Sequence, residues 1–334
     1  MIVGSAPREP SEDALCASYG WGAAARTITR VSPPLVIAHR GACGHRPEHT
    51  RSALLLAIEQ GADAIEVDVV PTADGALVVR HEPELSGTTD VAARPEFAAR
   101  RRVRTIDGRR MRGWFAEDLT LAEVRTLGAR ERLPRLRAAS AAHDGAEGVL
   151  TLGEALGIAA DGGVRLVIEL KHSARSAAIG LPLDVALRRE LAAAPALPAV
   201  TVESFEHDAL DALAEQGVRH PMVALIGHRP LLDGRLLADP AAFRRFAGVS
   251  LRTGLVRPRT TGRFRDLGLD VWAWTLRPEN RFLPPRHRLP VGAFGRYREH
   301  WRRLVGTGLT GVFADHPDLV LDALRGPAAV GGPA

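Results

Sequence analysis

Hydrophobic and polar positions recur with two different periods along this chain. Short runs rich in β-branched residues appear from Leu35 onward, and segments with apolar positions three or four residues apart fill the intervals between them. Strands that alternate with helices in this way predict a parallel sheet built from βα units. The strands are expected at 35–38, 64–69, 164–170, 199–203, 222–226, 247–250, 270–276 and 311–315.

Eight strands of this kind favour a closed α/β fold, the (β/α)8 TIM barrel. The sixth strand, 247–250, has a weak pattern, and the apolar run 77–80 is either a strand within a loop or a replacement for one of the eight. Thr151 with Glu154 three residues later predicts a capping box at the start of a helix. The helices are expected at 50–60, 151–160, 182–194, 206–216, 235–246, 261–267, 296–306 and 317–324.

The alternation of strands and helices stops between His81 and Leu150. This stretch is rich in arginine and contains turn signals such as Ser86-Gly87 and Asp107-Gly108. A loop of that length is too long to lack structure in a compact domain, so we expect an inserted subdomain after the second strand, at about 82–150. The predicted domains are an N-terminal extension (1–33), a barrel domain (34–325) that contains the insertion, and a flexible C-terminal tail (326–334).

Composition agrees with a large folded core. The hydrophobic fraction is 46% and the mean hydropathy is -0.05. No apolar run approaches the roughly 18 to 20 residues that cross a bilayer, so we expect no stable membrane insertion. The first 30 residues lack the order of a secretory signal, which predicts a cytoplasmic protein. The two cysteines, Cys16 and Cys43, form neither a disulfide framework nor a CxxC zinc motif.

The charge pattern points to small phosphate-bearing partners. The formal net charge of +5 comes from arginines spread along the chain, which argues against nucleic-acid binding, while a mildly positive field still attracts phosphates. Of the 44 lysines and arginines, 43 are arginine and one, Lys171, is lysine. Because all other basic positions are arginine, Lys171 is a candidate for a role that needs a compact ammonium group.

Three acidic side chains are expected to point into the barrel mouth. Alternation along 64–69 turns Glu66 and Asp68 to the same side, and alternation along 166–171 does the same for Glu169 and Lys171. Buried carboxylates need compensation, and three of them suit one divalent cation, Ca²⁺ or Mg²⁺. The competing interpretations are a carboxylate pair held by arginines and a local ion pair between Glu169 and Lys171.

Histidines follow two of the predicted strands. His39 comes at the end of the first strand with Arg40 beside it, and His81 follows the run 77–80. Two histidines beside a metal can act as general base and general acid, and an arginine fork can bind a phosphate. Each residue alone is more often a surface or packing residue, so the interpretation depends on the combination. Asp315 is either a further mouth residue or a helix cap, and Phe205 and Trp274 are core aromatics or pocket walls.

These residues and their order resemble the glycerophosphodiester phosphodiesterase family, over about residues 35 to 324. The segments ELSGTTDVA (84–92) and GWFAEDLTLAEVRTL (113–127) are similar to the longer bacterial branch of that family, whose members are often exported. The motifs are HRG (39–41), PEHT (47–50), EVDV (66–69), TADG (72–75), VVRHE (78–82), IELK (168–171), SFE (204–206), WT (274–275) and FADHPD (313–318).

The resemblance implies a role for each candidate residue. It implies that the carboxylates hold the metal, that the histidines are the catalytic pair, and that a small-molecule phosphodiester contacts the two basic side chains. Two positions depart from the family pattern, His49 where asparagine is common and Glu82 where the family has aspartate. The metal ligands are Glu66, Asp68 and Glu169, the catalytic pair is His39 and His81, and the phosphate contacts are Arg40 and Lys171.

The activity that the resemblance implies is metal-dependent hydrolysis of glycerophosphodiesters to sn-glycerol 3-phosphate and an alcohol. One alternative is a related barrel phospholipase acting on lysophospholipids, for which exposed apolar loops would be expected in place of an arginine-rich one. Another alternative is a binding barrel without catalysis, in which the candidate residues would have been lost. The head-group alcohol, the attacking nucleophile (water or the neighbouring glycerol hydroxyl) and the oligomeric state stay open at this point.

Overall fold

The computed structural model of this chain describes residues 33–194, 198–227 and 239–325. The predicted tail, and all of the predicted N-terminal extension except its last residue, lie outside the described residues, and the domain boundaries stay predictions. Among the described helices, none combines the length and the apolar character that crossing a bilayer requires.

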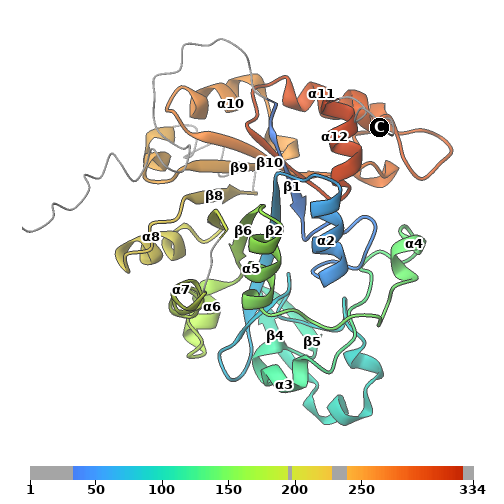
Figure 1. Ribbon diagram of the computed structural model, residues 1–334, viewed down its shortest axis with the longest axis vertical. Coiled ribbons are helices and arrows are strands. Elements are labelled where there is room, and N and C mark those ends of the chain that lie inside the picture. The colour runs from blue at the N-terminus through green and yellow to red at the C-terminus, as the bar shows by residue number, and fades with distance from the viewer. Residues whose placement is uncertain (1–32, 195–197, 228–238, 326–334) are drawn as a thin grey trace, which may run out of the picture. The chain divides into compact units, whose positions relative to one another are not determined.

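Eight parallel strands form a closed barrel, which confirms the predicted TIM barrel (Figure 1). Each strand pairs with the next around the ring, and β1 pairs with both β11 and β2 to close it. All eight predicted strands are present, including the weak sixth one, which is β9. The barrel strands are β1 (Leu35–His39), β2 (Ala64–Pro71), β6 (Arg165–Leu170), β7 (Val200–Ser204), β8 (Met222–Ile226), β9 (Gly248–Arg252), β10 (Asp270–Leu276) and β11 (Gly311–Ala314).

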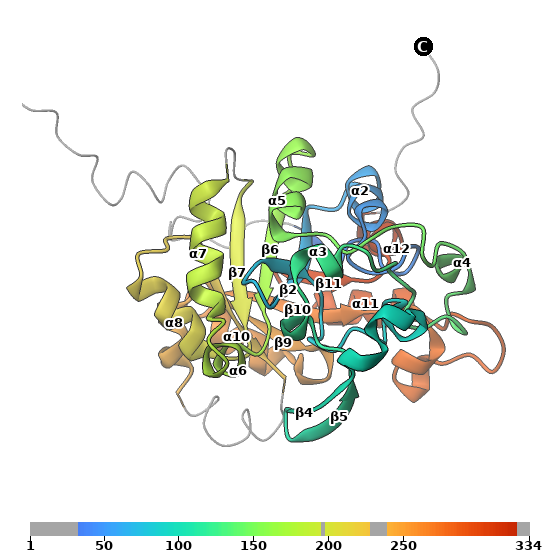
Figure 2. The ribbon, with the colours of Figure 1, turned by 90° about the horizontal axis from the view of Figure 1, so that it is seen from below.

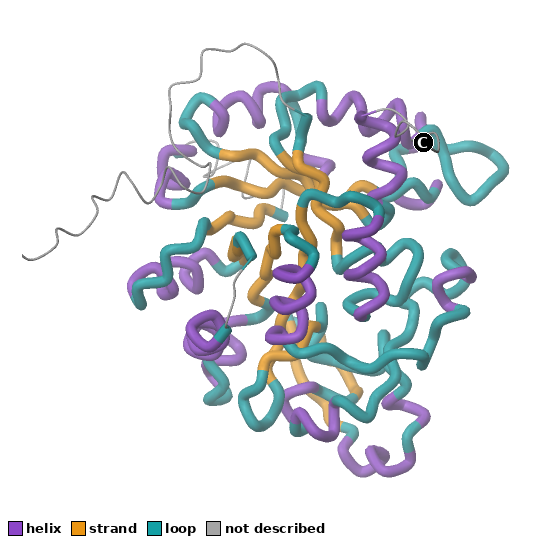
Figure 3. The backbone as a smooth tube through the Cα atoms, viewed as in Figure 1, coloured by secondary structure: helices purple, strands orange, loops and turns teal. Residues whose placement is uncertain are grey.

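Helices surround the barrel and bury its outer apolar face (Figure 3). The capping box predicted at Thr151 is present, because the Thr151 hydroxyl accepts from the Glu154 N–H and the Glu154 carboxylate accepts from the Thr151 N–H. The outer helices are α2 (Arg51–Glu59), α5 (Leu152–Asp161), α6 (Ser173–Ala178), α7 (Leu183–Ala193), α8 (His207–Glu215), α10 (Pro258–Arg265), α11 (Tyr297–Val305) and α12 (Pro317–Arg325).

The prediction of a helix at 235–246 is wrong for residues 239–246, which are the part of this range that the structure describes. There the chain forms a short 3₁₀ helix, Pro240–Arg245. Phe243 and Phe246 are both buried, 4% and 5% exposed, and this spacing of three residues suits a 3₁₀ turn that leads directly into β9. The run 77–80 proves to be β3 (Leu77–Val79), an extra strand that pairs antiparallel with β2 and replaces none of the eight.

The long segment between β3 and α5 has structure of its own. It contains an antiparallel hairpin, β4 (Arg102–Ile106) with β5 (Arg109–Gly113), and the short helices α3 (Leu121–Val124) and α4 (Ala138–Ala141). A second apolar cluster beneath it includes Leu85, Phe97 and Trp114 and contacts β2 and β3 through Val70 and Val78. Figure 2 shows the hairpin extending away from the barrel. This insertion brings additional charged residues to the barrel mouth.

Candidate active site

The three predicted carboxylates meet where β2 and β6 end. Asp68 and Glu169 are directly opposite each other in the pairing of the two strands, and Glu66 lies two residues before Asp68 on the same side of β2. One oxygen from each of the three lies within 4.8 Å of the other two, and all three residues are buried. Lys171, one residue beyond β6, places its Nζ 3.0 Å from Asp68 Oδ1 and 2.5 Å from Glu169 Oε1.

Burial and mutual repulsion give these carboxylates different charge states. Burial, together with the negative charge of Asp68, holds the pKa of Glu66 well above its usual range. Burial raises the pKa of Glu169 to about 8 even though the Lys171 ammonium opposes this effect. Asp68 has a pKa well below the usual range despite its burial, because Lys171 and Arg40 place positive charge beside it. Additional positive charge would therefore be needed for Glu66 and Glu169 to be fully ionised at neutral pH.

The three carboxylates fit a divalent cation. Glu66 Oε2 accepts a 2.9 Å hydrogen bond from the Arg40 N–H, but Glu66 Oε1 is buried and accepts none from the described residues. A buried oxygen without a donor, in a cluster where burial and repulsion raise the pKa values of Glu66 and Glu169, is what a bound cation would satisfy. Oxygen donors in this number suit a hard ion such as Ca²⁺ or Mg²⁺.

Glu169 gives the metal-free protein a stability that depends on pH. Its pKa rises from 4.5 to about 8 on folding, so its contribution is complete below the unfolded value and is lost as pH rises toward the folded one. We expect ionisation of Glu169 alone to lower the free energy of unfolding in EDTA by roughly 1 kcal/mol between pH 7 and pH 8, since one pKa unit corresponds to about 1.4 kcal/mol. Glu66, whose pKa is also raised, should add to this fall. Denaturant unfolding at the two pH values measures this change.

Excess Ca²⁺ or Mg²⁺ is the comparison for this experiment, because a cation that binds the ionised carboxylates should abolish the fall. The window begins at pH 7 because buried histidines, whose pKa values are lowered, change stability in the opposite direction as pH rises toward 6.5. An equal fall with and without the cation would show that Glu169 does not share in its binding.

His39 is held by a buried carboxylate at the barrel mouth. Its Nδ1 lies 2.7 Å from Asp315 Oδ1, while Asp315 Oδ2 accepts hydrogen bonds from Arg137 (2.5 Å) and Arg277 (2.7 Å). Burial and the nearby Arg40 charge lower the pKa of His39 to about 4, so the ring is neutral at pH 7. With Nδ1 donating to Asp315, Nε2 is the atom that carries the free lone pair. Asp315 is therefore a mouth residue, one of the two roles expected for it.

His81 has a similar partner, Glu82. Its Nδ1 lies 2.6 Å from Glu82 Oε1, and burial together with Arg40 and Lys171 lowers the pKa of His81 to about 3. Arg132, from the insertion, donates to Glu82 at 2.7 and 2.6 Å and to Glu48 at 2.7 Å through two nitrogens. The longer acid at position 82 thus binds the histidine and Arg132 together.

Arg40 contacts the carboxylate cluster and lies near both histidines. Its backbone is left-handed, with φ 61°, and the following Gly41 also has positive φ. A Cβ on Gly41 would lie 2.6 Å from the carbonyl carbon of Ala53, so the HRG turn requires glycine there. The Arg40 guanidinium binds Glu48 through Nη1 at 3.2 Å and lies 3.2 Å from Asp68 through Nε. Its Nη2 has no partner among the described residues.

Two buried residues of the site were not among the predicted ones. His49 Nε2 lies 2.9 Å from Asp68 Oδ2, and its backbone has φ 61°, a conformation that favours glycine and asparagine over other residues. Glu203 on β7 lies opposite Glu169, is 1% exposed, and has a pKa well above its usual range because of burial and the Glu169 charge. The departure from the family pattern at position 49 was a sequence signal for His49. Alternation of side chains along 200–204 could have shown that Glu203 points into the barrel.

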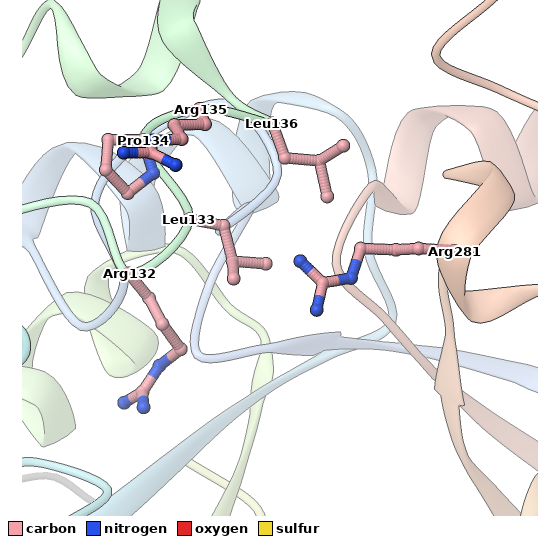
Figure 4. Close-up of a pocket in the computed structure, with 6 residues that line it drawn as sticks. All are labelled: Arg132, Leu133, Pro134, Arg135, Leu136 and Arg281. Atoms are coloured by element: carbon pink, nitrogen blue, oxygen red, sulfur yellow. The ribbon is translucent and has the colours of Figure 1, made fainter.

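Aromatic and apolar residues line the rim of the mouth. Phe205 and Trp274 pack edge to face with centroids 5.5 Å apart, and Phe205 is 43% exposed, which favours the pocket-wall interpretation for that ring. Beside Arg132 lies a hollow of about 280 Å³. Figure 4 shows Arg281 extending toward Leu133 in this hollow. The rim therefore offers apolar surface around a charged centre.

Comparisons with known proteins agree on one family. The profile of the "Glycerophosphoryl diester phosphodiesterase family" matches residues 39–319. A glycerophosphodiester phosphodiesterase of Arabidopsis thaliana is 47% identical over 105 residues, 31% of this chain and 28% of that protein. One of Haemophilus influenzae is 42% identical over 96 residues, 29% of this chain and 24% of that protein. These alignments thus span about a quarter of the length of those curated relatives.

A solved structure extends the likeness to nearly the whole chain. An Oleispira antarctica phosphodiesterase, solved in complex with the product sn-glycerol-3-phosphate, superposes with a TM-score of 0.66. The superposition covers 88% of this chain and 97% of that one at 22% sequence identity. At that identity the likeness supports the barrel fold.

Proposed function

This chain belongs to the glycerophosphoryl diester phosphodiesterase family, and on that premise we propose that it hydrolyses glycerophosphodiesters to sn-glycerol 3-phosphate and an alcohol with the aid of one divalent cation. The observation that carries the proposal is the meeting of Glu66, Asp68 and Glu169 beside His39 and His81 at one end of the barrel. The product in the Oleispira antarctica structure is the one expected here.

Charge neutralisation of the phosphodiester is the first task of the site. A cation held by the three carboxylates would supply Lewis-acid stabilisation of the charge that develops on the phosphate oxygens. Arg40 contributes its free Nη2, and the Arg40 main chain is fixed by the hydrogen bond from its N–H to Glu66. Lys171 bridges the carboxylates of Asp68 and Glu169 through its ammonium group, which lies at the carboxyl end of β6.

Proton transfer falls to the two histidines. Each donates Nδ1–H to a carboxylate, Asp315 or Glu82, and each thereby keeps its Nε2 as an acceptor. In this proposal one Nε2 takes the proton of the attacking hydroxyl and the other ring, protonated, gives a proton to the leaving alcohol. Positive charge around His81 lowers its pKa, so an anionic phosphate that offsets Arg40 and Lys171 makes that ring easier to protonate.

A substrate panel tests the reaction class. Glycerophosphocholine, glycerophosphoethanolamine and lysophosphatidylcholine are incubated with the protein, and the products are separated. The proposal predicts sn-glycerol 3-phosphate and free alcohol from the first two at rates well above that for the lysolipid. Faster release of head group from lysophosphatidylcholine would instead favour the phospholipase alternative. Phosphorus NMR during the reaction shows whether a cyclic phosphate forms before sn-glycerol 3-phosphate or whether water attacks the diester directly.

Replacing Lys171 by Arg is expected to damage activity although arginine is the basic residue used everywhere else in the chain. Lys171 is 8% exposed and its Nζ fits between two carboxylate oxygens, whereas a guanidinium is larger and directs its donors in one plane. We expect kcat/KM on glycerophosphodiesters to fall about tenfold or more, each factor of ten being about 1.4 kcal/mol.

The matched control for this variant is Arg188→Lys, a swap between the same two residue types at an exposed position of α7. Both variants should unfold near the wild-type temperature, and the control should keep wild-type kinetics. If Lys171→Arg also kept wild-type kinetics, the lone lysine would be an accident of composition and would leave the site.

A further inference from the structure

The hairpin β4–β5 presents arginines that no acidic residue neutralises. Two arginines at this end of the insertion are paired with acidic residues. Arg100, just before the hairpin, pairs with Glu123, and Arg104 of β4 pairs with Asp118. The remaining five are exposed and form no ion pair with any carboxylate in the described part of the chain. These five, here called the hairpin arginines, are Arg101, Arg102, Arg109, Arg110 and Arg112.

One face of the hairpin combines positive charge with apolar surface. In the strand register Val103 is opposite Arg112 and Thr105 is opposite Arg110, and side chains opposite each other share a face. All four are exposed, and Val103 is 48% exposed. The arginines on this face border a shallow hollow of about 390 Å³ that is also lined by Val103 and Met111. Cationic and apolar side chains therefore lie side by side around this hollow.

The hairpin lies beside the barrel mouth. Asp107 at its tip places Oδ1 3.2 Å from Nδ1 of His172, the residue that follows Lys171. Glu117 fixes the other end, because its carboxylate binds both Arg104 of β4 and Arg175 of α6. Figure 2 shows β4 and β5 extending beyond the barrel at this side. A partner bound to the hairpin would therefore lie next to the candidate active site.

We propose that this hairpin docks the protein on an anionic lipid surface, with the hairpin arginines against lipid phosphates and Val103 toward the acyl layer. A plane of phosphates matches an open array of arginines that keep their charge at any physiological pH. A single small anion would bind one or two of these arginines and would leave the others, and Val103, without a partner. A nucleic acid would use the charge but would leave Val103 without a partner. This binding is peripheral and does not depend on the proposed reaction.

Vesicle binding by the full chain tests the proposal without any substrate. The probes are vesicles of phosphatidylcholine alone and of phosphatidylcholine mixed with phosphatidylglycerol, and sedimentation gives the partition coefficient. Each arginine near an anionic surface contributes about a fivefold gain in affinity, so Arg109→Gln, Arg110→Gln and Arg112→Gln together should lower binding to the anionic vesicles about 10²-fold. Wild-type binding should also weaken steeply as salt screens the charges.

The matched control removes the same number of charges from elsewhere. Arg188, Arg189 and Arg219 are exposed and form no ion pair among the described residues, and they lie on α7 and in the turn before β8. Their triple replacement by glutamine should change vesicle binding less than about threefold, since charges farther from the lipid than a Debye length are screened. Unchanged thermal unfolding of both triple variants would show that the fold is kept.

Three results would overturn the proposal. The first is equal binding of the wild-type protein to neutral and anionic vesicles, or none to either. The second is an equal loss of binding in the two triple variants. The third is binding of duplex DNA by the wild-type protein, lost in the hairpin variant, with no binding to anionic vesicles, which would assign the hairpin to nucleic acid.

Discussion

Replacing Glu66 or Glu169 by glutamine, or Asp68 by asparagine, is expected to abolish both binding of a divalent cation and turnover. Each change keeps the shape of the side chain and removes one charged oxygen from a group whose ligand atoms lie within 4.8 Å of one another. The affinity of a site for a hard cation depends on the charge and number of its ligands, so the loss of one carboxylate of three should weaken cation binding severely. Calorimetric titration with Ca²⁺ and Mg²⁺ measures it directly.

The metal-free Glu66→Gln and Glu169→Gln variants should not be less stable than the wild-type protein. Burial and repulsion raise the pKa values of Glu66 and Glu169, so neutral glutamine at either position relieves a strain that the wild type carries at pH 7. Glu279→Gln is the matched control, because Glu279 is equally buried but binds Arg137 outside the carboxylate cluster. It should bind the cation normally. Unchanged cation affinity in all three ligand variants would refute the metal site.

Removing either histidine is expected to lower kcat by about 10² or more with little change in cation affinity, as loss of a general acid or base does. The rings of His39 and His81 are each oriented by a carboxylate through Nδ1, and each has Nε2 free for proton transfer. Steady-state kinetics of His39→Ala and His81→Ala on glycerophosphocholine measure the loss.

His45→Ala is the control for these variants. His45 also pairs with an aspartate, its Nε2 lying 2.9 Å from Asp318 Oδ1, but its side chain is 33% exposed and lies outside the site. It should keep near-normal turnover. A diester with a p-nitrophenol leaving group needs no protonation of that group, so it should restore much of the rate of whichever variant lacks the acid. A histidine variant that turns over glycerophosphocholine at the wild-type rate would remove that residue from the mechanism.

The barrel could be predicted from the sequence because strand periodicity and burial act locally. Even the weak strand 247–250 forms, where Gly248 packs so closely that a Cβ would lie 2.7 Å from the Asp270 carbonyl oxygen. The prediction failed at 240–245, where two phenylalanines three residues apart set the local helix type through tertiary burial. Such contacts between distant segments have no local pattern.

The acidic centre of the site follows from alternation along two strands, whereas its supporting residues do not. Glu66, Asp68, Glu169 and Lys171 could be placed together because strand geometry fixes which side each faces. Arg132 and Arg137 come from the insertion, and nothing in the sequence distinguishes them from the other arginines of the chain. Their importance depends on where an irregular segment folds. The roles of the site residues, the domain boundaries and a cytoplasmic location stay predictions.

The most direct test of metal-dependent glycerophosphodiester hydrolysis is a phosphorus NMR time course of glycerophosphocholine with the protein in EDTA, followed by addition of Ca²⁺ or Mg²⁺. We predict that the diester signal is unchanged in EDTA and converts to sn-glycerol 3-phosphate once the cation is added. Conversion at the same rate in EDTA, or none after either cation with a protein shown by calorimetry to bind it, would contradict this account.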